Sequence, residues 1–493
     1  MPKSEIKTLL MQSSGDHTLW NRAQAYIYTV GIEKAVVAEG FFDFVETVNR
    51  EDLVEWVIVS HKSSKLHFED LDYGHFDLRE VATRWLQKNK VFEAKGFKGI
   101  QFSDTKDGKI EIINSLNLDA FVDDLEEIFQ HPKFPKDLMQ FLYAPLNKSI
   151  PKSEQSARTF AWSEIKDSIS AKITDYPKLL SLFPQLCFKD MKMVRGGLNN
   201  RCYTIEHENQ GYFVKIFAEV DSMGRDRFTA ELNFREYYCD SVVKDSLIPL
   251  VNYDKKNRVM SFPIGTPTAK GTLAVDQAVD FIAKLSAVSR AKKVENLNWA
   301  SEAHQSIPYS MANLQKRIVN ISKFVPSEWK EKLDFSFKEL ERKINFGNSN
   351  LFLSEDEYIN SPSDFGFHNS VNWKGKLFFC DFEYAGKDHP TKLLADFILH
   401  PEFNLSISDI QYITIESERI FGHDGFSEKL ELALAIFSLK WVVTLLGDYS
   451  PEVNERRKAA LNIRHIDFDK RIKLQEKKSA RMLERHRGIL AGL

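Results

Sequence analysis

"SPSDFGFHNSVNWKGKLFFCDFEYAG", residues 361–386, places two acids and an amide around a short hydrophobic hairpin. Asp364 precedes Asn369 by five residues, and Asp381 follows the strand pattern "KLFFC". Phosphoryl transfer from ATP uses such a set, with one carboxylate near an acceptor hydroxyl and an amide and a second carboxylate on Mg²⁺. The rest of the chain then has to supply the groups that bind the nucleotide.

The composition is that of a globular protein with several domains. The chain has 493 residues, of which 43% are hydrophobic and 28% charged. A net charge of −3 creates no field that attracts nucleic acid or membranes, so we expect neither as a partner. The four cysteines form no CxxC pair, which fits a reducing compartment and argues against a zinc site. Without a long apolar run, we expect a cytoplasmic protein with no membrane span.

The first part of the chain alternates between strand and helix patterns. The patterns are, in order, a strand at 55–60, helices at 77–89 and 109–118, and a strand at 119–124. This alternation predicts a parallel α/β domain over residues 1–150, with functional side chains at the carboxyl ends of its strands. Ser60, Asp123 and Asp124 fall at such ends.

A different pattern begins near residue 190. The patterns are, in order, a hairpin at 201–217 around an Asn-Gln-Gly turn, a helix at 227–243, a strand at 257–262, and helices at 274–345 and 429–446. We therefore expect a sheet lobe at 190–266 and a helical lobe at 267–450. The Pro-, Ser- and Lys-containing residues 151–189 would form a linker that leads into short helices before them.

Residues 451–493 are a basic helical tail. Interspersed acids dilute its positive charge. We therefore favour a helix that packs on the helical lobe over a helix that binds nucleic acid or an anionic surface.

Three patterns before the opening stretch suit a bound nucleotide. "GGLNNRCYTI", 196–205, puts two glycines before a strand, where backbone N–H groups could approach phosphates, although an ordinary glycine turn has the same pattern. Lys215 lies among apolar residues of the next strand, from which it could reach phosphates or extend into solvent. Glu231 has the spacing of a helix glutamate that pairs with such a lysine, and Glu236 is a weaker candidate.

Taken in order, these patterns resemble the aminoglycoside phosphotransferase/choline kinase-like family over residues 190–450. The matching motifs are "GGLNNRCYTI", "DFGFHNSV" and "FFCDFEYAGKDHP". The resemblance implies a bilobal protein-kinase-like fold. It also implies ATP- and Mg²⁺-dependent transfer of the γ-phosphoryl group to a hydroxyl of a small molecule, such as a sugar, an amino sugar or an amino alcohol.

The resemblance assigns a role to each matching residue. Asp364 would be the catalytic carboxylate, and Asn369 and Asp381 would hold Mg²⁺. The nucleotide would contact Gly196, Gly197 and Asn199 in the phosphate-facing loop, Lys215 with its partner Glu231, and backbone groups of 260–265 that include Met260 and Phe262. Asp388 and Asp396 match downstream acids that we interpret as structural.

One position departs from the family pattern. The family usually has a histidine two residues before the catalytic aspartate, where it braces the loop through hydrogen bonds. This chain has Pro362 there. Proline has no side-chain hydrogen bond to offer, but its fixed φ could brace the loop in a different way.

The N-terminal part resembles a haloacid dehalogenase-like domain. By that resemblance Ser60 would bind phosphate, Lys109 would neutralise charge, and Asp123 and Asp124 would be metal ligands. The matching first strand would be "AYIYTVGIEK", 25–34. It carries Tyr28 and Val30 where the family has its nucleophile and acid/base, and Asp43 lies in a helical pattern. A carboxylate nucleophile is therefore missing, and we expect a degenerate domain kept for packing or for presenting substrate. A relict metal site at Asp123 and Asp124 stays open as an alternative.

The predicted fold class is α/β plus α+β: a dehalogenase-like parallel domain, then a bilobal kinase-like fold with a helical tail. We expect a small-molecule kinase. One alternative is a pseudokinase or nucleotide sensor, and another is a phosphatase that works through the N-terminal domain. The sequence does not determine the oligomeric state, the identity of the acceptor, or whether the nucleotide is ATP or GTP.

Overall fold

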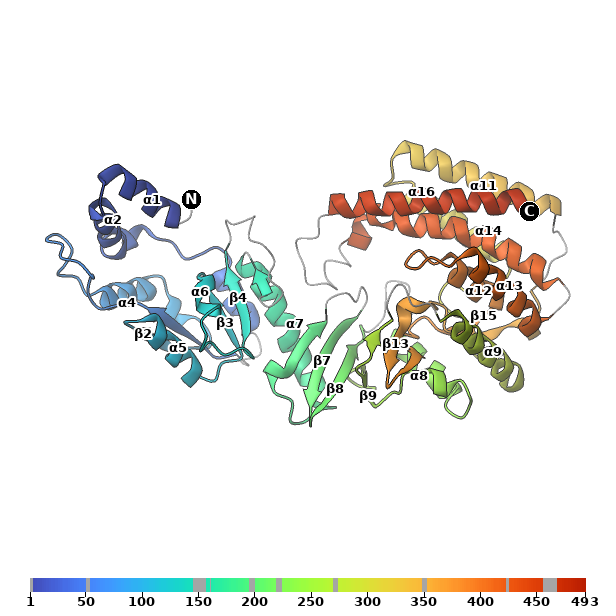
Figure 1. Cartoon of the computed structure of the whole chain (residues 1–493), viewed down its shortest axis with the longest axis horizontal. Helices are drawn as coiled ribbons and strands as arrows, with labels where there is room; N and C mark the ends of the chain where they lie inside the picture. The colour runs from blue at the N-terminus through green and yellow to red at the C-terminus, as the bar shows by residue number, and fades with distance from the viewer. Residues whose placement is uncertain are drawn as a thin grey trace. The chain divides into compact units, whose positions relative to one another are not determined.

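The structure is a computed structural model. It describes residues 3–49, 54–144, 157–159, 161–194, 200–218, 224–268, 274–347, 353–422, 425–454 and 468–493. The chain divides into two compact units, the first comprising Met1–Leu180 and Gln185–Met191 and the second comprising Ser181–Pro184 and Lys192–Leu493. Figure 1 labels the elements of both.

The first unit combines helices with small parallel sheets (Figure 1). Its helices are α1 (Lys3–Ser14), α2 (Thr18–Tyr28), α3 (Phe41–Val48), α4 (Leu78–Lys88), α5 (Lys106–Ser115), α6 (Glu126–Phe129) and α7 (Trp162–Leu180), with 3₁₀ turns η1 (Gly31–Lys34), η2 (Val91–Glu93) and η3 (Phe188–Asp190). Its strands are β1 (Trp56–His61), β2 (Phe97–Ser103), β3 (Ala120–Asp123), β4 (Met139–Tyr143) and β5 (Ala157–Thr159).

The predicted alternation of strands and helices is present, but within the described residues the strands do not join in one sheet. β1 pairs with β2, and β3 pairs with β4, which pairs with β5, all in parallel. A shared hydrophobic cluster contains Val59 of β1, Phe121 of β3, and Ile110 and Ile113 of α5. Side-chain packing therefore links the two sheets where backbone hydrogen bonds do not.

The prediction of a first strand at 25–34 is wrong. Residues up to Tyr28 continue helix α2, and Gly31–Lys34 form η1. The aromatic run "AYIY" suggested a strand, but the helix formers before it extend the helix, and Trp20 and Ala25 are its buried side chains. Tyr28 and Val30 therefore do not lie at the end of a strand, where the resemblance would place a nucleophile.

The prediction of a linker at 151–189 is also wrong for most of its described length. Trp162–Leu180 form the 19-residue helix α7. Ile165 and Ile169, one helical turn apart, pack in a hydrophobic cluster with Val48 and Phe141 of the first unit. The linker-like composition came from the Pro-, Ser- and Lys-containing stretches that flank α7 in the sequence, 147–160 and 181–186.

The second unit begins with a five-stranded sheet. Its strands are β6 (Met191–Val194), β7 (Arg201–His207), β8 (Gln210–Ile216), β9 (Asn252–Asp254) and β10 (Val259–Pro263), in the order β6-β7-β8-β10-β9. The predicted hairpin is the antiparallel pair β7 and β8. Its turn is at Glu208 and Asn209, both with positive φ, slightly before the predicted Asn-Gln-Gly turn. Helix α8 (Arg227–Tyr237) packs Phe228 and Leu232 against this sheet.

The remainder of the second unit is mostly helical, as predicted. The helices are α9 (Val275–Lys292), α10 (Ile307–Ile321), α11 (Ser327–Gly347), α12 (Pro390–Leu399), α13 (Ile407–Phe421), α14 (Phe426–Leu445) and α16 (Phe468–Gly492), with 3₁₀ turns η4 (Lys244–Ser246), η5 (Glu355–Glu357), η6 (Phe367–Asn369) and η7 (Leu446–Tyr449). The short strands are β11 (Thr266–Pro267), β12 (Ile359–Ser361), β13 (Ser370–Trp373), β14 (Lys376–Phe379) and β15 (Gly386–Asp388). β12 pairs with β15 and β13 with β14, so the loops between them lie side by side.

Among the described residues, one helical segment, Phe426–Tyr449, is long and apolar enough to cross a membrane. Its interruptions by charged residues kept it from standing out as an apolar run in the sequence. In the structure 67% of the most apolar part of this segment is buried. Ala433 and Leu439 of α14 pack with α10 and α12, which is how the central helix of a helical bundle behaves.

The described part of the basic tail packs on the helical part, as we expected, and residues 455–467 lie outside the described residues. Met482, Leu483 and Leu490 of α16 join the cluster that contains α14. One face of α16 therefore contributes to the core, and most of its cationic side chains lie on the other face.

This packing predicts a difference between two leucines of α16. Leu483→Ala should lower the free energy of unfolding by about 2–4 kcal/mol, because Leu483 is 4% exposed and its loss leaves a cavity. Leu474→Ala, at a position that is 55% exposed, should change it by less than about 0.5 kcal/mol. Urea denaturation of the full chain measures both, and equal effects would mean that α16 does not dock through this face.

Candidate active site

A buried lysine gathers three carboxylates in the second unit. Lys215 lies on β8 and is 5% exposed. Its Nζ is 2.5 Å from Asp381 Oδ1, 2.8 Å from Glu383 Oε2 and 3.4 Å from Glu231 Oε2. A strand, a helix and the loop after β14 thus bring together three residues that the sequence predicted, Lys215, Glu231 and Asp381.

The charge of this lysine is stabilised by its neighbours. Burial alone would lower the pKa of Lys215, but the charges of Asp381, Glu231 and Glu383 outweigh burial and raise that pKa well above its ordinary value. Lys215 is therefore an ammonium group at neutral pH, held at the centre of the cluster. Removing it would leave buried carboxylates without compensation.

Glu231, and not Glu236, is the helix partner of this lysine. Glu231 is buried and faces Lys215, whereas Glu236 is exposed on α8. Arg235, one turn along the helix, donates from Nε and a terminal nitrogen to Glu231 Oε1 at 3.2 and 3.0 Å. Both oxygens of Glu231 are therefore held, which fixes α8 against β8.

The loop that carries Asp381 is anchored by stacked aromatic rings. Phe382 stacks on Phe234 of α8 at 4.5 Å between ring centroids. Asp381 has φ +67°, a strained conformation for a residue other than glycine. The packing of Phe382 holds this conformation and directs the Asp381 carboxylate toward Lys215.

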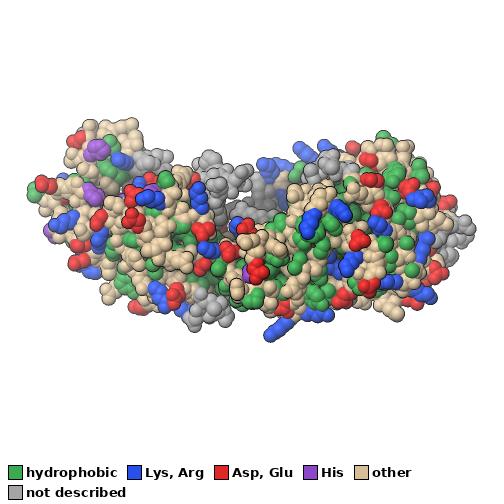
Figure 2. All heavy atoms as spheres, turned by 60° about the horizontal axis from the view of Figure 1, so that its bottom comes forward, with side chains coloured by type: hydrophobic (Ala, Val, Ile, Leu, Met, Phe, Trp, Pro, Cys, Tyr) green, Lys and Arg blue, Asp and Glu red, His purple; other side chains and the backbone are tan. Residues whose placement is uncertain are grey.

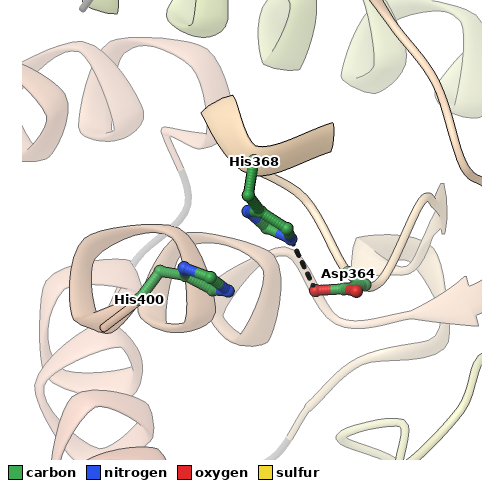
Figure 3. A group of neighbouring side chains, drawn as sticks. All are labelled: Asp364, His368 and His400. Carbon is green, nitrogen blue, oxygen red and sulfur yellow. Dashed lines mark hydrogen bonds and ion pairs between the residues drawn. The ribbon is translucent and has the colours of Figure 1, made fainter. Parts of the chain in front are cut away.

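Asp364 lies in the loop between β12 and β13, with its side chain 41% exposed. His368 donates from Nε2 to Asp364 Oδ1 at 3.1 Å (Figure 3). Burial by the loop would raise the pKa of Asp364, but the hydrogen bond and charge of His368 and the charge of His400 outweigh burial and lower that pKa to about 2. Asp364 is therefore an ionised, partly accessible carboxylate.

Two histidine rings flank this carboxylate (Figure 3). The rings of His368 and His400 stack at 3.9 Å with 6° between their planes. Ligand atoms of Asp364, His368 and His400 lie within 4.8 Å of one another, a spacing that could suit a metal ion. His368 bonds and orients Asp364, whereas Nδ1 of His400 accepts from the backbone N–H of Glu402, which fixes the His400 ring.

The predicted Mg²⁺ ligands offer hard oxygen atoms, which suit that ion. Asn369 donates from Nδ2 to the backbone oxygen of Asp364 at 2.9 Å, which leaves its amide oxygen as the atom it can offer a cation. Asp381 bonds Lys215 through Oδ1. The residues present therefore fit Mg²⁺, and Glu383 adds a further carboxylate beside them.

The other predicted nucleotide contacts have different outcomes. Gly196, Gly197 and Asn199 lie outside the described residues. Met260 and Phe262 are buried in the cluster between the sheet and α8, and Met260 pairs across the sheet with Lys215. Their side chains support the sheet behind the lysine, and contact of their backbone with adenine stays a prediction.

A buried lysine braces the loop that carries Asp364, where Pro362 stands in place of the expected histidine. Lys392 of α12 donates to Ser363 Oγ at 3.1 Å, and Ser363 Oγ donates to the backbone oxygen of Ser301 at 3.2 Å. Lys392 is held between Asp388 at 3.2 Å and Asp396 at 3.1 Å. The two acids are thus structural, as interpreted from the sequence, and they act on the loop through Lys392.

Four residues that complete the site were not predicted from the sequence. They are Asn200, which donates to Glu383, together with Glu383, His368 and Lys392. The i, i+4 spacing of Asp388, Lys392 and Asp396 was a signal for a buried ion network. Glu383, two residues after Asp381, was a signal for a second carboxylate.

In the first unit the structure brings together only part of the predicted set. Lys109 Nζ is 2.5 Å from Asp123 Oδ2, and both side chains are buried. Burial and the neighbouring Asp123 raise the pKa of Asp124. Ser60 lies near the end of β1. The pair has the character of a buried structural ion pair, and the dehalogenase-like identity stays a resemblance.

No family model and no curated protein matches the chain. Among solved structures it is similar to a spectinomycin phosphotransferase, APH(9)-Ia, in complex with ADP and spectinomycin (14% identity, TM-score 0.43, 63% of this chain and 98% of that chain). It is also similar to the choline kinase LicA from Streptococcus pneumoniae (14% identity, TM-score 0.41, 64% of this chain and 98% of that chain). A third is a choline/ethanolamine kinase family protein from Mesorhizobium loti (12% identity, TM-score 0.41, 65% of this chain and 99% of that chain). Because these sequence identities and TM-scores are low, the chemistry of this chain has to be derived from its own residues.

The brace on the catalytic loop predicts a selective effect of removing one hydroxyl. Ser363→Ala should lower kcat by about 10-fold to 100-fold and leave nucleotide affinity unchanged, because a loop misplaced by about 1 Å misaligns Asp364. Ser289→Ala is the matched control, since Ser289 is buried and bonds the backbone of Asn360 outside the loop. Steady-state kinetics and nucleotide titration check this. An equal loss of kcat in both variants would reduce the effect to general destabilisation.

Proposed function

We propose that the chain is an ATP- and Mg²⁺-dependent phosphotransferase that moves the γ-phosphoryl group to a hydroxyl of a small molecule. The observation that carries the proposal is the cluster of Lys215, Glu231 and Asp381 beside the loop with Asp364 and Asn369. Kinases require this combination of a strand lysine paired to a helix glutamate, a catalytic aspartate, and metal-binding Asn and Asp.

Asp364 acts on the acceptor hydroxyl. A carboxylate with a pKa near 2 is a weak base, so it mainly orients the hydroxyl and accepts its proton late in the transfer. This suits a loose transition state, in which little negative charge has to form on the attacking oxygen. His368 keeps Asp364 ionised and fixes its rotamer through the 3.1 Å hydrogen bond.

The other residues hold the nucleotide. Asn369 and Asp381 would hold Mg²⁺, which when bound neutralises charge on the transferring phosphates. Lys215 contributes a fixed positive charge for the α- and β-phosphates. It reaches them by exchanging its contact with Asp381 for phosphate oxygens, while Glu231 keeps it in place.

This proposal is favoured over a pseudokinase by the state of the catalytic loop. Pro362 removes the usual brace, but Lys392 and Ser363 replace it, and Asp364 stays accessible and ionised. A chain that only sensed nucleotide would not need an accessible Asp364. We propose a cytoplasmic location, and a packing or substrate-presenting role for the first unit.

The first test concerns Asp364. Asp364→Asn should lower kcat by about 10²-fold to 10⁴-fold with the acceptor that the wild-type chain phosphorylates in a metabolite panel. Calorimetry should show unchanged Mg·ATP affinity, because Asp364 acts on the acceptor. Asp356→Asn, at an exposed position, is the control for the same charge loss. Near-normal turnover by Asp364→Asn would remove it from the catalytic role.

The second test concerns the metal ligands. Asp381→Ala should weaken Mg·ATP binding by about 10-fold or more, and Asn369→Ala by less, because an amide is neutral. With EDTA in place of Mg²⁺, the same titrations should show little difference between the variants and the wild-type chain. An equal loss in EDTA would instead assign Asp381 to positioning Lys215.

A further inference from the structure

The second unit contains a cavity of about 770 Å³, a size suited to a small molecule. The segment before and at the start of α8, the loop 297–305, and helices α10 and α14 line it. Nothing described above assigns a ligand to this cavity.

One wall of the cavity is made by the segments that support the catalytic loops. Ser301 lines it and accepts the hydrogen bond from Ser363, the residue before Asp364. Gly386 also lines it, five residues after Asp381, and a Cβ there would lie 2.5 Å from the backbone oxygen of Asn298. The wall is therefore fixed closely against the loops of the active site.

Charged side chains give the lining a positive surplus. Its cations are Arg225, Lys316, Arg317 and Lys440, and its acids are Asp226 and Glu302. Asp226 is paired at 2.6 Å with Arg258, which is not part of the lining. Glu302 pairs with Arg317 at 2.8 Å and with Lys440 at 3.1 Å, and Asp396, outside the lining, lies 3.5 Å from Lys440. The positive surplus of the lining therefore comes chiefly from Arg225 and Lys316.

The positive lining is a local feature. Figure 2 shows acidic and basic side chains interspersed over the face it presents, and the net charge of the chain is −3. The cavity also carries six amide and four hydroxyl side chains. Amides both donate and accept hydrogen bonds, as the recognition of several hydroxyl groups requires.

Two of the four aromatic side chains that line the cavity, Trp299 and Phe437, already hold a lysine over one ring face. Lys387 Nζ lies 4.7 Å from the ring centroid of Trp299, and Lys440 Nζ lies 5.1 Å from that of Phe437. These lysines already occupy ring faces to which a quaternary ammonium or amino group would bind. Like charge would further disfavour such a ligand.

We infer that this cavity binds the phosphoryl acceptor, and that the acceptor is an anionic molecule with several hydroxyls, such as a sugar acid or a sugar phosphate. The inference rests on the proposed function and names its substrate class. Asp364 does not line the cavity, so the acceptor extends from it toward the catalytic loop, with its anionic group among the cations and a hydroxyl at Asp364.

A matched series of sugars tests the charge preference with the full chain. Glucuronate, glucose 6-phosphate, glucose and glucosamine share one ring and differ in charge. Saturation-transfer NMR measures binding, and ADP release with product mass measures transfer in Mg·ATP. We expect the anions to bind at least about 10-fold more tightly than glucosamine, with glucose between, and to be phosphorylated. The anion that binds more tightly shows whether the acceptor carries a carboxylate or a phosphate group.

A charge reversal in the lining tests the location. Lys316 is exposed on α10 and lines the cavity, so Lys316→Glu should fold normally and raise the KM for the better anion by about 10-fold at unchanged kcat. Lys323→Glu, an exposed lysine outside the lining, should change KM by less than about twofold because of screening. Equal effects of both changes would overturn the location.

The outcomes separate this inference from the proposed function. A chain that binds Mg·ATP but prefers glucosamine, or binds none of the four sugars, contradicts the inference and leaves the phosphotransferase standing. A chain that binds the anions without phosphorylating either also contradicts it, because the cavity would then not hold the acceptor. A chain that does not bind Mg·ATP at all contradicts the proposed function.

Discussion

The active site depends on one buried ammonium group. Lys215 is fixed by β8, which is hydrogen-bonded on both sides within the sheet. Its three carboxylates come from α8 and from the loop after β14. Glu231 and Glu383 would be costly to bury without a cation, so the lysine determines where α8 and the loop after β14 can lie. The sheet and the helical part are thereby joined by charge as well as by apolar packing.

Much of this site could be predicted from the sequence, because its residues lie in short motifs with local geometry. The spacing of Asp364 and Asn369 and the strand before Asp381 are set by a hairpin of a few residues. What the sequence did not reveal is held by long-range contacts. Asn200 bonds Glu383, which lies 183 residues further along the chain, and Lys392 bonds Ser363, which lies 29 residues before it. The spacing of residues within a helix or strand does not indicate such pairs.

The first unit was predicted less well, for a different physical reason. Its strands are short, and aromatic residues occur in helices as well as in strands, so residues 25–28 followed the helix formers before them. α7 shows the opposite case, because the stretches that flank it have the composition of a linker, whereas Ile165 and Ile169 of the helix pack in the core. In both cases tertiary packing decided between two structures that the local sequence allowed.

The brace around Ser363 is part of a longer series of charges. Lys392 contacts Ser363 and Asp396, Asp396 lies 3.5 Å from Lys440, and Lys440 contacts Glu302. Ser363 itself has φ +65°, so this loop is held under strain by its contacts. Lys440 is thus three contacts from the strained residue, and a molecule that competes for Lys440 would alter the balance of charge at Lys392. A ligand bound at Lys440 and the alignment of this loop would then be linked thermodynamically through the same series of charges.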